Sequence, residues 1–236
     1  MEKPVYQRVL LKISGEALAG EARTGLDFTM LGRVADVLKE CLAMGVQMGL
    51  VVGGGNFWRG AKKEQMERSH ADQMGMLATV MNALALADVC QRRGVPARVM
   101  SALDIPAVAE RYTYRGAMEA LEQGRVVIFG AGTGHPYFST DTGAVLRAAE
   151  IHADAILLAK NIDGVYSADP KKDPDAVRYE TVSYEEVLAK RLAVMDLTAT
   201  SLAMDNRLPL LVFALREPRN ILRAVRGEKM GTLVGL

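Results

Sequence analysis

Three apolar runs of this chain each end in a glycine-dense turn that carries a polar or cationic residue. The turns span residues 12–16, 53–56 and 130–136. Glycine lets the main chain approach an anion closely, and successive N–H groups then form a concave anion site, often at the start of the next helix. One such turn is more often a plain strand-to-helix connection. Three together favour an enzyme that handles phosphates.

Strand-like and helix-like patterns alternate along the chain. We expect strands at 5–13, 46–52, 95–100, 126–129, 155–159, 210–213 and 232–234, and helices at 28–42, 74–89, 115–122, 140–151, 184–191, 197–206 and 219–225, with Thr140 capping the fourth helix. Residues 161–178 are polar, contain two Asp-Pro pairs and predict an irregular lobe. This alternation predicts an α/β fold, a three-layer αβα sandwich with a central, mostly parallel sheet, in which ligands bind beyond the carboxyl ends of the strands.

The net charge excludes several classes of partner, and the cysteines and the first residues indicate the cellular location. The chain has 29 Lys and Arg against 28 Asp and Glu, so no overall field attracts nucleic acid or an anionic membrane. Cys41 and Cys90 lie in helix-like patterns without metal-ligand spacing, as expected of reduced thiols in a cytosolic protein. The first residues lack a signal-peptide pattern, and we expect no membrane span. The predicted location is the cytoplasm.

The first turn contains the main catalytic candidate. Lys12 ends a strand and is followed by Ser14 and Gly15, so its ammonium could bridge two phosphates while the following amides bind oxygens. Neither the P-loop pattern nor the dinucleotide glycine pattern is present. The alternative for Lys12 is a lysine at a strand end whose stem is buried and whose charge reaches solvent.

Three further charged residues follow the other turns or short apolar runs. Asp141 and Asp196 are candidates to orient Lys12 or to hold Mg²⁺, and Arg59 is a candidate to stabilise phosphoryl charge. The two aspartates could instead cap helices, and the arginine could be an ordinary surface residue.

Six motifs together resemble a known family. They are LKISGEAL at 11–18, GGGNFWRG at 53–60, DQMGMLAT at 72–79, GTGHPYFSTD at 132–141, DGVY at 163–166 and VMDL at 194–197. The chain resembles the bacterial uridylate (UMP) kinases of the amino acid kinase superfamily over nearly its whole length. The blocks at 72–79 and 132–141 are the ones specific to that branch.

The resemblance implies ATP-dependent phosphorylation of UMP to UDP with Mg²⁺, in pyrimidine nucleotide biosynthesis, by a cytoplasmic homohexamer. It also implies one domain over residues 1–236, with 1–160 mainly forming the sheet core and UMP site and 161–236 mainly forming the ATP lobe. GTP and UTP are possible effectors in such a family. Residues 20–25 depart from the pattern linked to GTP activation, so regulation is left open.

The resemblance also assigns roles by position. The catalytic residues implied are Lys12, Arg59, Asp141 and Asp196. The ATP site implied comprises Lys12, Ile13, Ser14, Gly15, Gly55, Arg59, Lys160, Asn161, Tyr166 and Asp169. The UMP site implied comprises Gly54, Asp72, Thr133, Gly134, His135, Pro136, Tyr137, Phe138, Ser139 and Thr140. No side chain is assigned as a definite metal ligand, and Mg²⁺ is expected to enter with ATP.

Two other functions stay open at this stage. One is a related kinase that phosphorylates a carboxylate or carbamate, such as an acetylglutamate or aspartate kinase. The other is a nucleotide-binding regulator or storage protein without turnover, although the intact Lys12, Asp141 and Asp196 speak against that. Met74, Met76 and Met81 are either core filler or part of a subunit interface.

Overall fold

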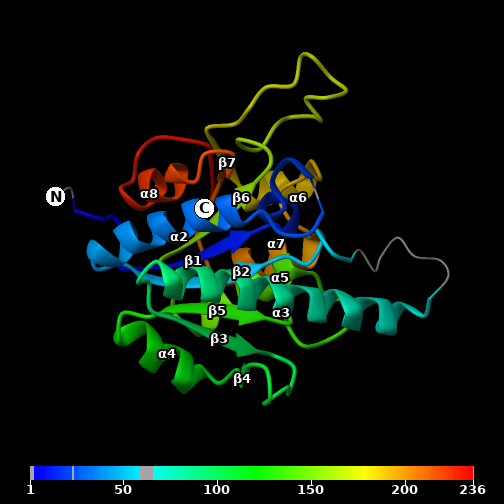
Figure 1. The fold of residues 1–236 in the computed structure, drawn as a ribbon. Coiled ribbons are helices and arrows are strands. Elements are labelled where there is room, and N and C mark those ends of the chain that lie inside the picture. Colours follow the sequence, from blue (N-terminus) through cyan, green and yellow to red (C-terminus); the bar gives the residue numbers. More distant parts are fainter. Residues whose placement is uncertain (1–2, 23, 59–65, 236) are drawn as a thin grey trace.

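The computed structural model describes residues 3–22, 24–58 and 66–235, and one nine-stranded sheet runs through them (Figure 1). Its strands are β1 (Arg8–Ile13), β2 (Gln47–Val52), β3 (Ala97–Ser101), β4 (Glu110–Arg111), β5 (Val126–Gly130), β6 (Ala155–Lys160), β7 (Thr181–Ser183), β8 (Leu210–Ala214) and β9 (Thr232–Gly235). Their order is β4-β3-β5-β2-β1-β6-β8-β9-β7. Among the strands of this sheet within the described ranges, β8 with β9 is the one antiparallel pair.

Helices cover both faces of this sheet. They are α1 (Gly15–Leu18), α2 (Phe28–Ala43), α3 (Arg68–Arg92), α4 (Tyr114–Glu122), α5 (Thr140–Glu150), α6 (Tyr184–Ala189), α7 (Leu197–Asp205) and α8 (Arg219–Val225), with a short 3₁₀ turn η1 (Gly20–Ala22). Side chains of α2, α3 and α8 form one hydrophobic core, and those of α4 to α7 form a second. Neighbouring strand residues alternate between them, with Leu11 in the first and Leu10 in the second. The predicted three-layer sandwich is confirmed.

Several predicted boundaries were wrong for identifiable reasons. The first strand begins at Arg8, because Val5 is 57% exposed and pairs only through its N–H with the Val225 carbonyl. Helix α3 begins at Arg68, six residues before the predicted start, because Glu67 caps it by accepting from the His70 N–H. Strands β4 and β7 are too short to give a two-residue period and were not predicted.

The expectation that no segment could span a membrane needs correction for α3. By length and composition alone this helix could cross a bilayer. Half of the apolar 18-residue stretch that would do so is buried inside the domain. Ala83, Leu86 and Cys90 of α3 belong to the first core. That burial is typical of the central helix of a folded domain.

The strand order determines which turns meet. β5, β2, β1 and β6 are consecutive and parallel, so their carboxyl ends lie at one edge of the sheet. The Gly53 N–H donates to the Ile13 carbonyl across 2.8 Å, which joins the turn after β2 to the turn after β1. Residues 161–178, after β6, project as a long irregular segment, yellow-green in Figure 1.

Candidate active site

A buried ion pair lies at the carboxyl end of β1. The Lys12 Nζ is 2.5 Å from the Asp141 Oδ1, and the two side chains are 7% and 18% exposed. Asp141 belongs to the first turn of α5, whose cap is Ser139, with its Oγ accepting from the Asp141 and Thr142 N–H groups at 2.9 and 3.2 Å. The capping alternative for Asp141 is therefore wrong, and so is the predicted Thr140 cap. Asp141 instead forms an ion pair with the Lys12 ammonium.

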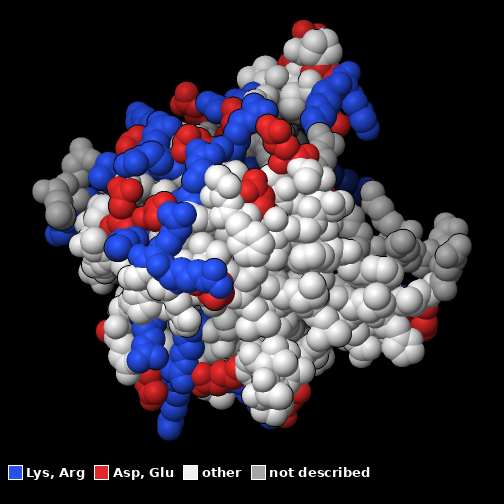
Figure 2. Space-filling model, in the orientation of Figure 1, with Lys and Arg blue, Asp and Glu red and all other residues white. Residues whose placement is uncertain are grey.

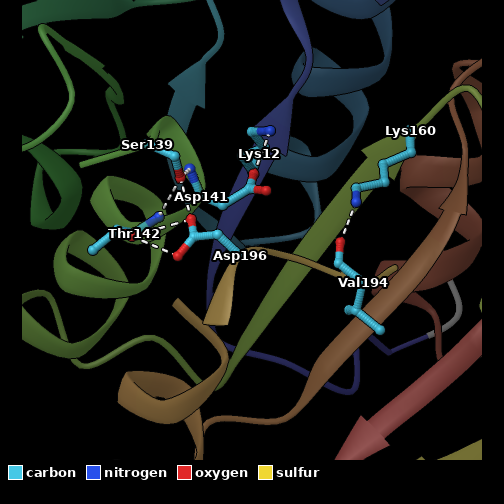
Figure 3. A network of polar contacts seen from close by, with 7 residues as sticks. All are labelled: Lys12, Ser139, Asp141, Thr142, Lys160, Val194 and Asp196. Atoms are coloured by element: carbon cyan, nitrogen blue, oxygen red, sulfur yellow. Dashed lines mark hydrogen bonds and ion pairs between the residues drawn. The ribbon is translucent and has the colours of Figure 1, made fainter. Parts of the chain in front are cut away.

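Asp196 has a different environment, as Figure 3 shows. It caps α7 by accepting from the Ala199 N–H at 2.9 Å, so its capping alternative is confirmed. It also accepts from the Ser139 Oγ, and from the Thr142 Oγ1 at 3.2 Å. These contacts connect the start of α7 to the start of α5. The carboxylate of Asp196 is engaged on both oxygens by protein donors.

The turn after β1 presses directly against the turn after β2. A Cβ on Gly15 would lie 2.5 Å from the Asn56 Oδ1 and 2.6 Å from the Gly53 carbonyl oxygen, so only glycine fits. Ile13 is fully buried beneath this contact. The Ser14 Oγ is buried and has no hydrogen-bond partner among the described residues. A buried polar atom normally has a partner, so this hydroxyl is available to a ligand or to water.

A pocket lies between α3 and the turns after β2 and β5. Its lining residues are Gly54, Trp58, Ala71, Asp72, Gly75, Met76, Thr79, Ala131, Gly132, Thr133, His135, Phe138, Ser139 and Thr140. A Cβ on Gly54 would lie 2.7 Å from the Gly75 carbonyl oxygen, so a side chain here would push α3 away from the turn. The Thr79 Oγ1 accepts from the Ala131 N–H at 2.7 Å, which fixes the third turn against the same helix.

Asp72 is the carboxylate of this pocket. Its Oδ2 accepts from the Arg68 Nε at 2.7 Å and from the Tyr137 N–H at 2.9 Å. Tyr137 has a φ of 71°, in the left-handed region, and its ring lies 5.3 Å from the Arg68 guanidinium carbon. These contacts close residues 134–138 over one end of the pocket. Tyr137 and Phe138 are 67% and 50% exposed, which leaves apolar surface free for a ligand.

The predicted ATP residues at the end of β6 and beyond it differ in their surroundings. The Lys160 Nζ donates to the Val194 carbonyl (Figure 3), and burial lowers the pKa of Lys160, while Asp141 raises it and Lys12 lowers it. Lys160 is thus within electrostatic reach of the Lys12–Asp141 pair. Asn161 and Asp169 are exposed. The Tyr166 hydroxyl donates to the Asp163 Oδ1 at 2.9 Å, which raises the pKa of Tyr166.

The residues present fit Mg²⁺ that enters with a nucleotide. Mg²⁺ is commonly held by one or two carboxylates together with substrate phosphates and water. Among the described residues no group of three or more His, Cys, Asp or Glu is arranged for a metal. Asp141 lies beside the Lys12 ammonium with its Oδ1 in the ion pair, and Asp196 is occupied by protein donors. The donor set therefore suits phosphate-held Mg²⁺.

The structure brings most of the predicted site residues to one sheet edge, but their roles stay predictions. Arg59 lies outside the described residues. The sequence did not assign Trp58, Gly75, Met76 or Thr79 to the pocket, although all four belong to the motifs at 53–60 and 72–79. Arg68 was also missed. Its signal was its position four residues before Asp72 on a helix, a spacing that brings two side chains together.

Comparison with known proteins places this site in a family. The family model described as "Amino acid kinase family" matches residues 7–214. The chain belongs to the amino acid kinase family. The fold described above is that of a kinase of this family.

Solved structures of similar proteins agree over nearly the whole chain. UMP kinase from Bacillus anthracis has a TM-score of 0.93 at 38% identity, covering 98% of this chain and 96% of its own. UMP kinase from Ureaplasma parvum has a TM-score of 0.92 at 38% identity, covering 100% of each chain. Uridylate kinase from Archaeoglobus fulgidus has a TM-score of 0.74 at 30% identity, covering 96% and 99%.

Proposed function

We propose that this protein transfers the γ-phosphoryl group of ATP to UMP, giving ADP and UDP, in pyrimidine nucleotide synthesis. The observation that carries the proposal is the position of the Lys12–Asp141 pair. It lies at the sheet edge whose neighbouring turns line a pocket containing Asp72 and Thr140. The 38% identity to two UMP kinases over at least 98% of this chain supports UMP as the acceptor.

The pocket between α3 and the third turn receives UMP. The Asp72 carboxylate accepts hydrogen bonds from two neighbouring ribose hydroxyls. The main-chain amides of residues 132–134 and the start of α5 bind the phosphate, which is an anion at neutral pH. Tyr137 and Phe138 offer ring surface to the base. Gly54 lets the second turn lie directly against α3, which forms the other wall of this pocket.

ATP occupies the other side of the same edge. The amides at Ser14 and Gly15 and the Ser14 hydroxyl bind its phosphates, with Gly55 and Arg59 as further contacts. Lys160, Asn161, Tyr166 and Asp169 form the nucleoside end of the site. Residues 1–160 then provide mainly the acceptor site and 161–236 mainly the ATP lobe.

The chemistry requires charge neutralisation more than a base. UMP phosphate is already ionised, so the obstacle is repulsion between two anions, which a cation and directed amides relieve. Lys12 supplies that cation, and Asp141 holds it in place. Mg²⁺, when bound with ATP, neutralises charge on the β- and γ-phosphate oxygens. No covalent enzyme intermediate is needed.

A coupled ADP-release assay tests this function. We expect ADP release with UMP, at least 10-fold lower kcat/KM with CMP, and no release above the ATPase background with N-acetylglutamate or aspartate. Preference for an amino acid acceptor would instead support a carboxylate kinase. Absence of ADP release with every acceptor, despite nucleotide binding, would support a binding-only protein.

Assembly and regulation are finer parts of the proposal. The exposed side of α3 carries Met74, Leu77 and Met81, which are 39%, 48% and 50% exposed, and the face over α3 is largely uncharged in Figure 2. Met76 is 8% exposed and is core. An apolar surface of this kind suits a subunit interface in a cytoplasmic homohexamer. Sedimentation equilibrium measures the mass, and adding GTP or UTP to the assay measures effector control.

A further inference from the structure

Two buried asparagines meet where the turns after β1 and β2 touch. Asn56 directly follows the triple glycine, and Asn82 lies in the middle of α3. They are 4% and 0% exposed. Each side-chain amide donates to the other, Asn56 Nδ2 to Asn82 Oδ1 at 3.0 Å and Asn82 Nδ2 to Asn56 Oδ1 at 2.8 Å. The pair forms a closed two-bond ring inside the protein.

The remaining amide hydrogens reach two backbone segments. The Asn82 Nδ2 also donates to the Gly53 carbonyl at 2.6 Å, and the Asn56 Nδ2 donates to the Gly25 carbonyl at 2.7 Å. The Gly25 N–H returns a bond to the Asn56 carbonyl at 3.2 Å. Both amides are therefore fully bonded. Four segments are joined by them: the second turn, α3, the loop at Gly25 and, through contact, the first turn.

The contact with the first turn is steric. The Asn56 Oδ1 is the atom that a Cβ on Gly15 would meet at 2.5 Å. Together with the Gly53 carbonyl oxygen, which that Cβ would meet at 2.6 Å, the oxygen that Asn82 holds in place therefore limits how closely the first turn approaches the second. One helical turn earlier, Thr79 binds the Ala131 N–H of the third turn. The buried side of α3 thus holds the second and third turns by hydrogen bonds. It holds the first turn through Asn56.

We propose that Asn56 and Asn82 are positioning residues for phosphoryl transfer, which hold the turn at residues 12–16 at a fixed distance from the turn at 53–56, whose Gly54 lines the proposed UMP pocket. The inference rests on the proposed function and adds a role for residues that lie outside the pocket lining. Transfer between two bound phosphates depends on approach within about 3–3.5 Å, and a misplacement of about 1 Å can cost on the order of 100-fold in rate.

A packing role alone does not account for two amides here. Buried amides lower stability unless every bond is made, and apolar residues of similar size carry no such requirement. Asn82 lies in an alanine- and leucine-rich helix whose Ala83 and Leu86 belong to the first core. The feature that leucine cannot supply is a donor to Gly53 and to the Asn56 oxygen. That donor acts on the position of the turns.

The test compares Asn82→Leu and Asn82→Asp with Leu86→Ala, a matched control one turn further along α3. Leu86 is fully buried in the same core, and its apolar side chain can donate no hydrogen bond to the three turns. We expect Asn82→Leu to lower kcat at least ~30-fold with the KM values for ATP and UMP within about 3-fold, because positioning is lost and the binding surfaces stay. Leu86→Ala should lower the Tm with kcat within about 2-fold.

The Asn82→Asp variant adds a second measurement, the pH dependence of kcat, which a packing role would not change. At pH 8 the carboxylate cannot donate, so Asn82→Asp should lose activity like the leucine variant. Burial raises the pKa of such a carboxyl, so lowering the pH restores a donor. Relative to wild type at each pH, kcat should recover several-fold between pH 8 and pH 6. A flat ratio, or near-normal kcat in Asn82→Leu, would overturn the proposal.

Hydrogen–deuterium exchange separates this proposal from the proposed function. Asn82→Leu should speed amide exchange in peptides covering residues 13–16 and 53–58, with little change in Leu86→Ala. Unchanged exchange in those peptides would refute the positioning role, whatever the reaction. If wild type shows no UMP-dependent ADP release, the proposed function fails while the exchange result still decides the amide pair.

Discussion

The proposed acceptor side and the proposed ATP side of this sheet edge are built differently. On the acceptor side, the turns are held to α3 by buried bonds such as Thr79 to Ala131 and by close packing at Gly54. On the ATP side, residues 161–178 are mostly exposed, and Asp163 is held by an ion pair with Arg178 whose side chains are 53% and 39% exposed. Exposed pairs contribute about 0–1 kcal/mol.

This difference indicates where rigidity is needed. A rigid pocket selects an acceptor by shape and by fixed donors, because a loosely held site loses affinity to ordering costs. The proposed ATP lobe is held partly by exposed contacts, which stabilise it weakly. We therefore expect substitutions on the acceptor side to change acceptor use strongly and those on the ATP lobe to change ATP affinity modestly.

The largest effect should come from Lys12, which lies between the two sides. Lys12→Ala removes the cation at the transfer point, so we expect kcat/KM to fall at least ~10²-fold with the fold intact, as measured by circular dichroism and steady-state kinetics. Lys190→Ala is the control, since this lysine is exposed and pairs with Glu186. Near-normal turnover in Lys12→Ala would remove this residue from the mechanism.

The next effect tests the acceptor side. In Asp72→Asn the amide keeps one acceptor but loses the charge and the second ribose bond, so the KM for UMP should rise about 10- to 100-fold while the KM for ATP stays within about 2-fold. Asp88→Asn on the same helix is the matched control, because Asp88 is exposed and pairs with Arg92. Equal increases in both KM values would break the proposed division between the two sides.

A third prediction concerns pH and Lys160. Burial lowers the pKa of this lysine below its ordinary 10.5, so its ammonium loses its proton earlier than an exposed lysine as the pH rises. The kcat/KM for ATP should fall along that alkaline limb, because a neutral Lys160 adds no positive charge near the Lys12–Asp141 pair. In Lys160→Arg the limb should move to higher pH, since guanidinium stays charged. An unmoved limb would show that the charge of Lys160 does not contribute to the use of ATP.

The smallest effect should come from the ATP lobe. Asp163 accepts from the Tyr166 hydroxyl and pairs with Arg178, so Asp163→Asn loosens the Tyr166 ring. We expect the KM for ATP to rise about 3-fold with kcat unchanged. Asp175→Asn, in the same segment, should change neither value by more than about 1.5-fold. A large loss of kcat in Asp163→Asn would contradict the picture of a weakly held lobe.

Much of the fold could be predicted from the sequence because its signals are local. Apolar runs that end in glycine indicated the strands around the site, and a parallel sheet places their ends together. The start of α3 could not be predicted, since residues 68–73 are mainly polar and small and their helix depends on Glu67 as cap. The exchange of roles between Ser139 and Thr140 is a one-residue cap error.

The site was harder to predict where its contacts are long-range. Asn82 gives no signal in an alanine-rich helix, because its meaning comes from Asn56, 26 positions earlier. Asp141 and Asp196 looked equivalent, both aspartates after short apolar runs. The structure separates them, with one holding Lys12 and the other capping α7. That distinction depends on where each aspartate lies at the start of its helix. Asp196 is itself the cap of α7, whereas Asp141 lies in the first turn of α5, which Ser139 caps.

The stereochemical course at phosphorus tests the central claim most directly. If ATP and UMP meet at one edge and transfer is direct, ATP made chiral at the γ-phosphorus with three oxygen isotopes should give UDP with inverted configuration at the β-phosphorus. One in-line displacement inverts the centre once. Retention would require two displacements through a phosphorylated enzyme, and it would contradict a site in which the two nucleotides touch.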